Sequence, residues 1–401
     1  MLTVEEAQSL VLQRVPRMPA ESVPLLEGHG RVLAEPVVAD ADIPPFDNTS
    51  MDGYAVVAAD TVTTPVDLEV VGVVPAGRVA EFTVGRGQAA KIMTGAPMPP
   101  GADAVVQVEW TEPLEQGRRV RIQRGVVPGQ NVRPRGEDMR RGEVVLQPGE
   151  RLTPAAIGML ATLGKASVAV YRRPRVAIIA TGDELLDLSE PLRPGAIRNS
   201  NSYALAAAVS SQGGIPWVLP PARDELASIE AVLQEAIAGA DVIVSSGGVS
   251  VGDFDLVKTA LERHGSLQFW QVRMKPGKPV VFGELTGRPF LGLPGNPVSA
   301  LVTFELFVRP LLREMQGDRH WQRPILPLPL GAAFTEVSDR RHYVRVRLAP
   351  NSEGQLAAWP NPDQGSNIQT SWHGAGGLMI VPEEAGPFPA GSILPVMLLD
   401  S

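Results

Sequence analysis

Residues 174–315 alternate between short apolar runs and segments with helical spacing, and this pattern constrains the fold most strongly. The cores of RVAIIA (175–180) and DVIVSS (241–246) are wholly apolar, and SNSYALAAAVSSQGG (200–214) between them has helical character. Continuous apolar strands with crossover helices are typical of a parallel sheet that is covered on both faces. We therefore predict a doubly wound, mostly parallel α/β domain. Its other strands are expected at 215–220, 267–272, 279–285 and 289–294, and its other helices at 224–239, 255–265 and 297–315.

The remaining segments predict two β-rich regions and a short helical one. Residues 44–150 place β-branched strands between Gly/Pro turns at short spacing, which is typical of a β domain. The N-terminal helix begins with a Thr3–Glu6 capping box and is expected to pack with a helix at 153–164, so the β region is an insertion. The predicted domains are 1–44 with 141–173 (discontinuous domain I), 45–140 (inserted β domain II), 174–320 (α/β domain III) and 321–401 (C-terminal β domain IV).

Composition excludes several classes of protein and site. The chain contains no cysteine, which rules out disulfides and thiolate metal sites, and its five histidines show no HxH or HxxxH spacing. Any bound metal is therefore expected to be a hard cation held by carboxylates. A net charge of −8 argues against general nucleic-acid binding, and no apolar run is long enough to span a membrane. The N-terminus lacks the pattern of a signal peptide, so we expect a cytoplasmic protein.

Polar, glycine-rich loops follow four of the predicted strands. Ligands of a doubly wound sheet bind outside the carboxyl ends of its strands, so these loops are expected to surround a ligand. Glycine-rich turns, helix starts and lysines suit phosphates, and carboxylates suit a magnesium ion that bridges them. Each loop alone is explained by turns and helix caps, but the four together favour a binding site. They are TGDEL (181–185), SSGGVSVGDFD (245–255), RMKPGKP (273–279) and LPGNPVSA (293–300).

Positive charge is concentrated in two loops of this acidic chain. NVRPRGEDMRRG carries four arginines between residues 133 and 141, and KPGKP carries Lys275 and Lys278. Such clusters suit a small polyanion rather than a long one, although each loop by itself is explained equally well as a solvated turn. The expected ligand is therefore a small molecule with several negative charges.

These motifs together resemble a known family. TGDEL, SSGGVSVGDFD, KPGKP and GLPGNPVSA are similar to the molybdopterin-binding domain of molybdenum-cofactor assembly proteins. PPFDNTSMDGYAV, IMTGAPMPPGADAVV and VRPRGED add segments that resemble the molybdopterin molybdenumtransferases, the MoeA and gephyrin E-domain family. The resemblance implies insertion of molybdate into adenylylated molybdopterin, with magnesium as cofactor and release of AMP. It also implies a homodimer whose active site combines the α/β domain of one subunit with the β domain of its partner, and transient contact with the adenylyltransferase and with maturation proteins of molybdoenzymes.

The resemblance also assigns roles to residues at matching motif positions. Gln271 departs from the family pattern, because members often carry a lysine after the FW pair, and Arg273 is expected to compensate for the lost anion contact. The residues implied to be catalytic are Asp52, Thr94, Asp138, Glu184 and Asp255. Those implied to bind magnesium are Glu184, Asp224, Asp253 and Asp255. Those implied to bind the substrate are Arg133, Thr181, Gly182, Asp183, Ser246, Gly247, Gly248, Ser250, Lys275, Lys278, Pro294, Gly295 and Asn296.

Two alternative functions remain open. The adenylyltransferase that makes the adenylylated substrate shares the α/β domain, but it usually lacks regions like SMDGYA (50–55) and VRPRGED (132–138). A non-catalytic scaffold, like the gephyrin E domain that anchors receptors, is argued against by the intact Asp52. In the C-terminal region, DRRHYVRVRL (339–348) is expected to be a strand with alternating exposed arginines, and Ser366 and Ser371 are expected near the substrate.

Overall fold

The chain divides into two units. The structure, a computed structural model, describes residues 1–13, 15–247, 259–260 and 263–399. The second unit consists mainly of one long insertion between segments of the first. Because this division separates only two units, it does not test the boundaries of the four predicted domains, which stay predictions. The first unit comprises Met1–Ala34, Pro148–Ile157 and Ser167–Ser401, and the second comprises Glu35–Gln147 and Gly158–Ala166.

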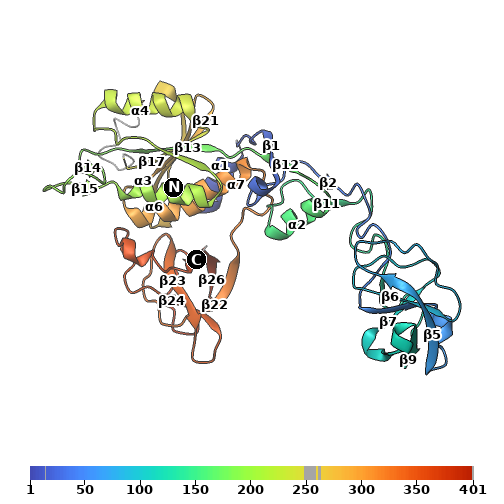
Figure 1. The fold of residues 1–401 in the computed structure, drawn as a ribbon. Helices are drawn as coiled ribbons and strands as arrows, with labels where there is room; N and C mark the ends of the chain where they lie inside the picture. The colour runs from blue at the N-terminus through green and yellow to red at the C-terminus, as the bar shows by residue number, and fades with distance from the viewer. Residues whose placement is uncertain (14, 248–258, 261–262, 400–401) are drawn as a thin grey trace. The chain divides into compact units, whose positions relative to one another are not determined.

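A six-stranded sheet forms the centre of the first unit (Figure 1). In spatial order its strands are β16 (Ile215–Val218), β13 (Arg175–Ala180), β17 (Val242–Ser246), β21 (Arg288–Leu293), β20 (Pro279–Leu285) and β18 (Gly265–Gln271). The first four are parallel, whereas β20 and β18 pair in antiparallel fashion. Between β20 and β21, Thr286 and Gly287 both have positive φ angles (46° and 81°), as a two-residue hairpin turn requires. The predicted doubly wound, mostly parallel sheet is confirmed.

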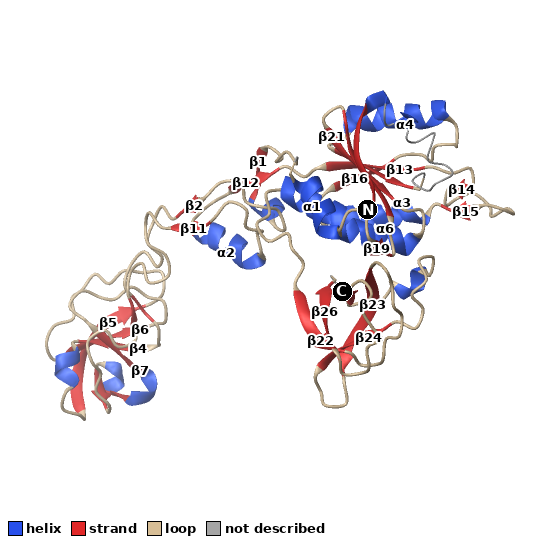
Figure 2. Ribbon diagram, turned by 180° about the vertical axis from the view of Figure 1, so that it is seen from behind, coloured by secondary structure: helices blue, strands red, loops and turns tan. Residues whose placement is uncertain are grey.

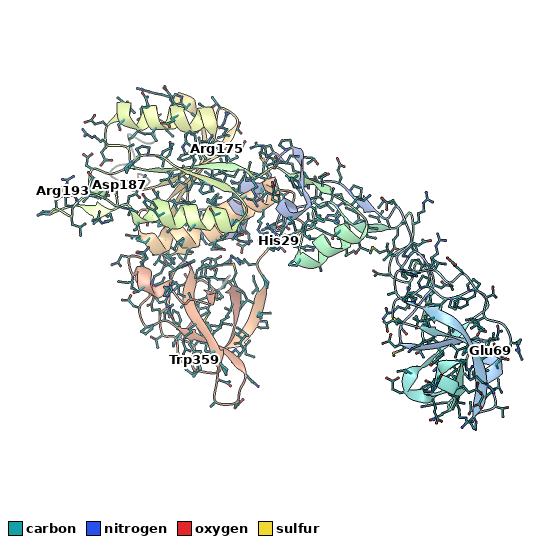
Figure 3. The ribbon with its side chains drawn as sticks, in the orientation of Figure 1. His29, Glu69, Arg175, Asp187, Arg193 and Trp359 are labelled. Atoms are coloured by element: carbon teal, nitrogen blue, oxygen red, sulfur yellow. The ribbon has the colours of Figure 1, made fainter. Side chains whose placement is uncertain are left out.

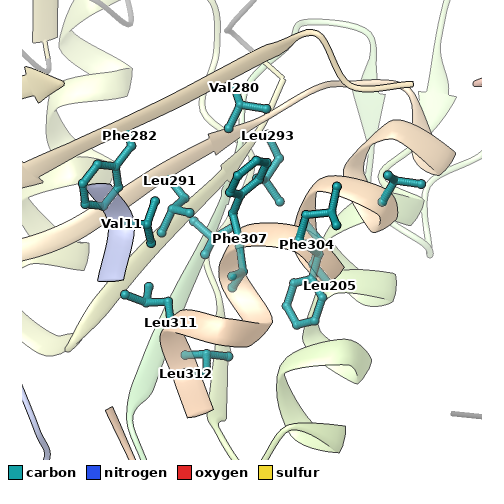
Figure 4. Packing of buried hydrophobic residues seen from close by; sticks show 14 of the residues in the cluster. Val11, Leu205, Val280, Phe282, Leu291, Leu293, Phe304, Phe307, Leu311 and Leu312 are labelled. Atoms are coloured by element: carbon teal, nitrogen blue, oxygen red, sulfur yellow. The ribbon is translucent and has the colours of Figure 1, made fainter. Parts of the chain in front are cut away.

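Helices cover both faces of this sheet, as its apolar strands require. Neighbouring residues of β13 point to opposite faces: Val176 and Ile178 pack in one hydrophobic cluster, and Ala177 and Ile179 pack in another. Figure 4 shows the first cluster, in which side chains of the closing helices pack against the sheet. On the first face lie α1 (Val4–Leu12), α3 (Ser200–Ser211), α6 (Pro297–Thr303) and α7 (Arg309–Met315), and on the second face lies α4 (Leu226–Gly239).

The helix predicted at 297–315 contains a π-helical turn at Phe304–Val308. Pro310 has no backbone N–H, so the carbonyl group of Leu306 loses its usual partner four residues later. The side chain of Gln8 in α1 replaces it and donates from Nε2 to the Leu306 carbonyl oxygen at 2.8 Å. The N-terminal helix is therefore attached to the irregular part of the closing helix.

Two predicted helix starts are confirmed by their caps. In α1, Thr3 Oγ1 accepts from the N–H of Glu6, and the Glu6 carboxylate accepts from the N–H of Thr3. In α2 (Pro154–Thr162), Thr153 Oγ1 accepts from the N–H of Ala156 at 3.2 Å. In the part of the chain that the structure describes, no helix is long and apolar enough to cross a membrane.

The C-terminal part of the first unit forms a second β structure that pairs with a loop of the central sheet. In order, its strands are β19 (Met274–Lys275), β23 (Arg341–Pro350), β25 (Gly377–Val381), β26 (Ile393–Leu398) and β22 (Ile325–Pro329), and β24 (Leu356–Pro360) also pairs with β23. Strand β19 belongs to the RMKPGKP loop (273–279) and pairs in parallel with the start of β23. Tyr343, Leu378 and Met397 pack in the same hydrophobic cluster as α6 and α7. The C-terminal strands are therefore packed directly on the α/β domain.

Two short ladders complete the first unit. Strand β1 (Ala20–Pro24) pairs in antiparallel fashion with β12 (Ser167–Tyr171), which joins the N-terminal segment to the chain that enters the central sheet. Strand β14 (Leu185–Leu186), which begins at the last residue of the TGDEL motif, pairs in parallel with β15 (Ile197–Arg198). The second ladder closes the segment between β13 and α3.

The second unit is built around a six-stranded, mostly antiparallel sheet (Figure 2). In spatial order its strands are β7 (Ala104–Gln107), β4 (Gly53–Val56), β6 (Gln88–Ile92), β5 (Val66–Val74), β9 (Arg119–Ile122) and β8 (Thr111–Leu114). Tyr54 and Val56 pack on one face and Ala55 on the other, so both faces of β4 are buried. The β-rich character predicted for this region is confirmed. Two small ladders, β2 (Val37–Val38) with β11 (Val144–Leu146) and β3 (Asn48–Thr49) with β10 (Val132–Arg133), complete the unit.

Candidate functional site

Strands β13, β17, β18 and β21 all end at one edge of the central sheet. Strands β13, β17 and β21 are parallel, and β18 runs in the same direction because two antiparallel pairings separate it from β21. Their carboxyl ends therefore share the edge at which doubly wound proteins bind ligands. The structure thus places the TGDEL, KPGKP and LPGNP loops and Ser246–Gly247 at this edge, as predicted from the sequence pattern. The predicted site residues Gly248, Ser250, Asp253 and Asp255 lie outside the described residues.

Asn201, which is absent from the predicted site residues, joins two of these loops. Its Nδ2 donates to Ser246 Oγ at 2.9 Å and to the Gly295 carbonyl oxygen at 2.7 Å. The two loops come so close that a β-carbon on Gly295 would lie 3.7 Å from the Cα of Gly247. The sequence RNSNS (198–202) contained a signal for this role. Asn199 caps the start of α3, so the second asparagine, Asn201, is not needed as a helix cap.

Carboxylates of the predicted site lie next to the end of β13. The N–H of Asp183 lies 3.4 Å from Oδ2 of Asp224, and the N–H of Asp224 lies 3.3 Å from Oδ1 of Asp183. Gly182 has a φ of 146°, and a β-carbon there would lie 2.4 Å from Oε2 of Glu184, so a larger residue would displace this carboxylate. Among the described residues, no three His, Cys, Asp or Glu side chains form a group that could hold a metal ion. Of the four predicted magnesium ligands, only Glu184 and Asp224 belong to the described residues.

A cavity of about 860 Å³ opens beside these carboxylates. Asp183, Tyr203 and Arg223 line it, and so do Asp187 and Arg193 on the segment between β14 and β15, where Figure 3 labels them. Small-molecule sites commonly have volumes of about 300–1,000 Å³. The cavity is therefore large enough for a nucleotide-sized ligand.

A second cavity, of about 740 Å³, lies where the KPGKP and LPGNP loops meet the C-terminal strands. Lys275 Nζ lies 2.8 Å from Glu336 Oε2 in an ion pair, and Asn296 Nδ2 donates to Ser366 Oγ at 2.9 Å. The predicted residues in its lining are Lys275, Lys278, Pro294, Asn296 and Ser366, and the C-terminal region adds Glu336, Arg340 and Asp363. The structure thus brings together predicted ligand-binding residues and a set of C-terminal polar residues that includes one predicted serine.

In the second unit, Asp52 and Thr94 form one hydrogen-bonded pair. The N–H and the hydroxyl of Thr94 both donate to Asp52 Oδ1, at 2.7 and 3.0 Å. These two bonds, the backbone one first, lower the pKa of the Asp52 carboxyl, although the side chain is exposed. Asp52 is therefore an exposed, ionised carboxylate that is oriented by a fixed backbone group.

Arg133 and Asp138 lie on an adjoining loop of the same unit. Arg133 in β10 pairs with Asn48 in β3, and the N–H of Ser50 donates to the carbonyl of Asn131, so this loop is attached to the segment that leads into Asp52. Asp138 is exposed and its N–H donates to the carbonyl oxygen of Ile43. The predicted residues of the second unit thus lie on hydrogen-bonded neighbouring segments.

Comparison with known proteins identifies the family. The chain matches three protein-family models. They are described as the MoeA N-terminal region (domain I and II), matched at residues 2–164, a probable molybdopterin binding domain, matched at 177–314, and the MoeA C-terminal region (domain IV), matched at 327–399. Molybdopterin molybdenumtransferase 2 of Mycobacterium tuberculosis is 39% identical to it over 99% of both chains. This chain belongs to the molybdopterin molybdenumtransferase (MoeA) family.

Further relatives agree with this family in sequence and in fold. The molybdopterin molybdenumtransferase of Haemophilus influenzae is 35% identical over 99% of this chain and 98% of its own length. A crystal structure of the molybdopterin biosynthesis moeA protein from Pyrococcus horikoshii matches the whole of both chains with a TM-score of 0.86 and 32% identity. The multidomain α/β and β architecture of the MoeA family is therefore the architecture of this chain.

The sequence-based description of β23 was wrong in one respect. The strand forms, but Arg345 is fully buried and only Arg347 of its three arginines is exposed. Arg345 lies on the same face of β23 as Tyr343, which packs into the cluster that the strand shares with the α/β domain. Its burial thus arises from packing between the two parts of the unit, which the local pattern does not contain.

The buried guanidinium of Arg345 has few partners. Its Nη2 donates to the carbonyl oxygens of Asp363 and Gly365, both at 3.2 Å, whereas Nε and Nη1 have no partner among the described residues. Burial lowers the pKa of this guanidinium. Because Asp363 and Gly365 line the second cavity, a buried positive charge stands directly behind its wall.

His342 on the opposite face of β23 is buried as well, with 1% of its surface exposed. Burial, together with the nearby charge of Lys275, lowers its pKa to about 4, so the ring is neutral at pH 7. The predicted residue Ser371 is also buried, and its hydroxyl donates to the carbonyl oxygen of Ile368. Of the two serines that were expected near the substrate, Ser366 lines the second cavity and Ser371 does not.

Proposed function

We propose that this chain is a molybdopterin molybdenumtransferase that inserts molybdate into adenylylated molybdopterin and releases AMP. The observation that carries the proposal is the 39% identity, over 99% of both chains, to a relative with that name. In this reaction an oxygen atom of water or molybdate attacks the phosphoanhydride bond of the substrate, and AMP leaves as that bond breaks. The dithiolene sulfurs then replace oxygen ligands of molybdate, which leave as water with the thiol protons. The absence of cysteine means that no protein thiol competes for the metal.

The charge distribution supports this reaction. The pyrophosphate of the substrate and the molybdate dianion repel each other, so a site must supply positive charge close to both. In the first unit, Lys275, Lys278 and Arg340 line the second cavity, with Arg345 behind its wall. This cavity suits a tetrahedral dianion, either molybdate or a phosphate group of the nucleotide.

The carboxylates beside the first cavity suit magnesium. Mg²⁺ is usually held by one or two carboxylates together with phosphate oxygens and water, so a complete protein cage is not needed. Glu184 and Asp224, with Asp183 beside them, would hold the ion next to the substrate phosphates. When bound, magnesium would neutralise phosphate charge, while Asp52 would position water or molybdate for cleavage of the anhydride.

A homodimer with shared active sites is the proposed assembly. Asp52 and Thr94 belong to the second unit, whereas Glu184 and Lys275 belong to the first, and a twofold dimer would place each second unit against the first unit of its partner. We expect this dimer in the cytoplasm, with transient contacts to the adenylyltransferase and to maturation proteins of molybdoenzymes.

The direct test measures AMP release from adenylylated molybdopterin with molybdate and Mg²⁺. We expect release by the wild-type chain and none without molybdate, whereas absence of AMP release under all conditions would refute the proposal. Mixing inactive Asp52→Asn with inactive Lys275→Ala tests the shared site. Random exchange makes about half the dimers mixed, each with one intact site of two, so roughly a quarter of the activity should return. No recovery, with subunit exchange confirmed by mass, would place both residues in the site of one chain.

A further inference from the structure

Lys275 in the second cavity is already paired with a carboxylate of the chain. Its Nζ lies 2.8 Å from Oε2 of Glu336, and the two side chains are 37% and 46% exposed. This hydrogen bond is the main reason why the pKa of the Glu336 carboxyl is lowered. Glu336 is therefore a charged group that stands where an incoming anion would meet the lysine.

The backbone on both sides holds this pair in place. Lys275 pairs with His342 in the parallel ladder of β19 and β23. On the other side, Phe334 exchanges two backbone hydrogen bonds with Phe388, at 2.9 and 2.8 Å, two residues before Glu336. The contact is thus a consequence of the packing between the α/β domain and the C-terminal strands, and the Glu336 side chain is exposed to solvent beside it.

Among the described residues, the other cations of the cavity have no partner carboxylate in its lining. Lys278 has no ion pair with any described residue, and Arg340 pairs with its own neighbour, Asp339, at 3.3 Å. Asp363, the second carboxylate in the lining, accepts the N–H of Gly365 at 2.8 Å and so serves the loop itself. Glu336 is therefore the carboxylate in the described lining that neutralises a cation of the cavity directly.

We propose that Glu336 is a displaceable counter-ion that an incoming tetrahedral dianion must remove from Lys275, so that Glu336 lowers the affinity of this cavity for the anion. The inference rests on the proposed function, because it assumes that the cavity binds molybdate or the phosphate of AMP. When the anion arrives, Lys275 exchanges the carboxylate for an anion oxygen, and Glu336 turns into solvent. Glu336 thereby makes binding weaker than the cations alone would allow, which favours release.

Titration of the full chain with molybdate and, separately, with AMP tests this inference by calorimetry in low-chloride buffer. Glu336→Gln keeps the shape of the side chain and removes its charge. Exposed ion pairs contribute little, so we expect about 1.5- to 5-fold tighter binding of the anion that occupies the cavity. Lys275→Ala should weaken binding of that same anion, which identifies whether the source is molybdate or the nucleotide.

A double-mutant cycle separates pairing from general electrostatics. In the Lys275→Ala background, Glu336→Gln should no longer tighten binding. As the matched control, Glu383→Gln removes a carboxylate of the same region that pairs with Arg341 at 3.9 Å, outside the cavity lining, and should bind like the wild type.

Two kinds of result would overturn the inference, and they differ from failure of the proposed function. If Glu336→Gln weakens binding or leaves it unchanged while Lys275→Ala weakens it, Glu336 is not a displaceable counter-ion, but the anion site stands. The same conclusion holds if the tightening persists without Lys275. If Lys275→Ala alters the affinity for neither anion, the cavity does not bind these anions, and the anion-binding part of the proposed function fails with it.

Discussion

Substitution of Gly53 by alanine should disturb the site through the backbone. Gly53 follows Asp52 directly, and a β-carbon there would lie 1.9 Å from the carbonyl oxygen of Val106 on the neighbouring strand β7. Ordinary contact begins at 3.4 Å, so the two strands would have to separate by up to 1.5 Å (3.4 minus 1.9) at this point. This shift is difficult because the atoms nearest to the added β-carbon are backbone atoms of β7, which cannot move aside as a flexible side chain could.

The size of the effect follows from the hydrogen bonds that such a shift breaks. The N–H of Val108 donates to the carbonyl oxygen of Asp52 at 2.9 Å, and a shift of this size would lengthen the bond beyond its useful range. Overpacking costs about 1–3 kcal/mol and a lost hydrogen bond about 0.5–1.5 kcal/mol, so Gly53→Ala should destabilise the second unit by roughly 2–4 kcal/mol. Displacement of Asp52 by about 1 Å should also lower the rate, on the order of 10²-fold.

Denaturant unfolding followed by circular dichroism, together with AMP release by the folded variant, measures both effects. Gly158→Ala is the matched control, since Gly158 lies in helix α2 with open space around its Cα, and alanine there should stabilise the helix by about 0.5–1 kcal/mol. A Gly53→Ala variant with wild-type stability and rate would refute the reasoning, because it would show that β4 and β7 accept a methyl group between them.

The remaining predictions concern titration and orientation of single groups. Thr94→Val removes the 3.0 Å hydroxyl bond to Asp52 but keeps the 2.7 Å backbone bond, so the pKa of Asp52 should rise only part of the way to its ordinary value. An NMR titration in which this pKa does not move would assign the whole effect to the backbone N–H. The pKa of His342 is about 4 in the folded chain, whereas that of an ordinary histidine is 6.5. As the pH falls, the unfolded chain therefore takes up the proton first. The free energy of unfolding should decrease by up to about 3 kcal/mol between pH 6.5 and pH 4. Unfolding titrations at several pH values test this, and His342→Leu should flatten the profile; an equal slope in both proteins would show that other groups cause it. Asn201→Ala should raise the KM for the adenylylated substrate more than it lowers kcat if Asn201 only positions Ser246 and Gly295. A loss confined to kcat would instead give Asn201 a direct part in the reaction.

Local sequence patterns determined much of the fold of this chain. The apolar runs at 175–180 and 241–246 predict parallel strands because only a sheet covered on both faces needs such runs, and β13 and β17 confirm it. The capping box at Thr3 and Glu6 predicts the start of α1 because its hydrogen bonds join residues three positions apart. The strand-end loops could be placed at one edge because strand direction follows from the order of elements.

Tertiary packing decided the burial of some residues and the contacts between distant segments, which local sequence patterns do not contain. Arg345 has the sequence neighbourhood of an exposed strand residue, yet it is fully buried because its face of β23 packs toward the α/β domain. The pairing of Lys275 with Glu336 joins residues that are 61 positions apart, and the bridge from Asn201 to Gly295 spans 94 positions. A sequence pattern reports which face of an element is apolar, but it does not report which distant element will cover that face. The predicted catalytic carboxylate and the glycine-rich strand-end loops were therefore recognisable as motifs, whereas the partner of Lys275, the buried arginine and the bridging asparagine depend on contacts that only the folded chain creates.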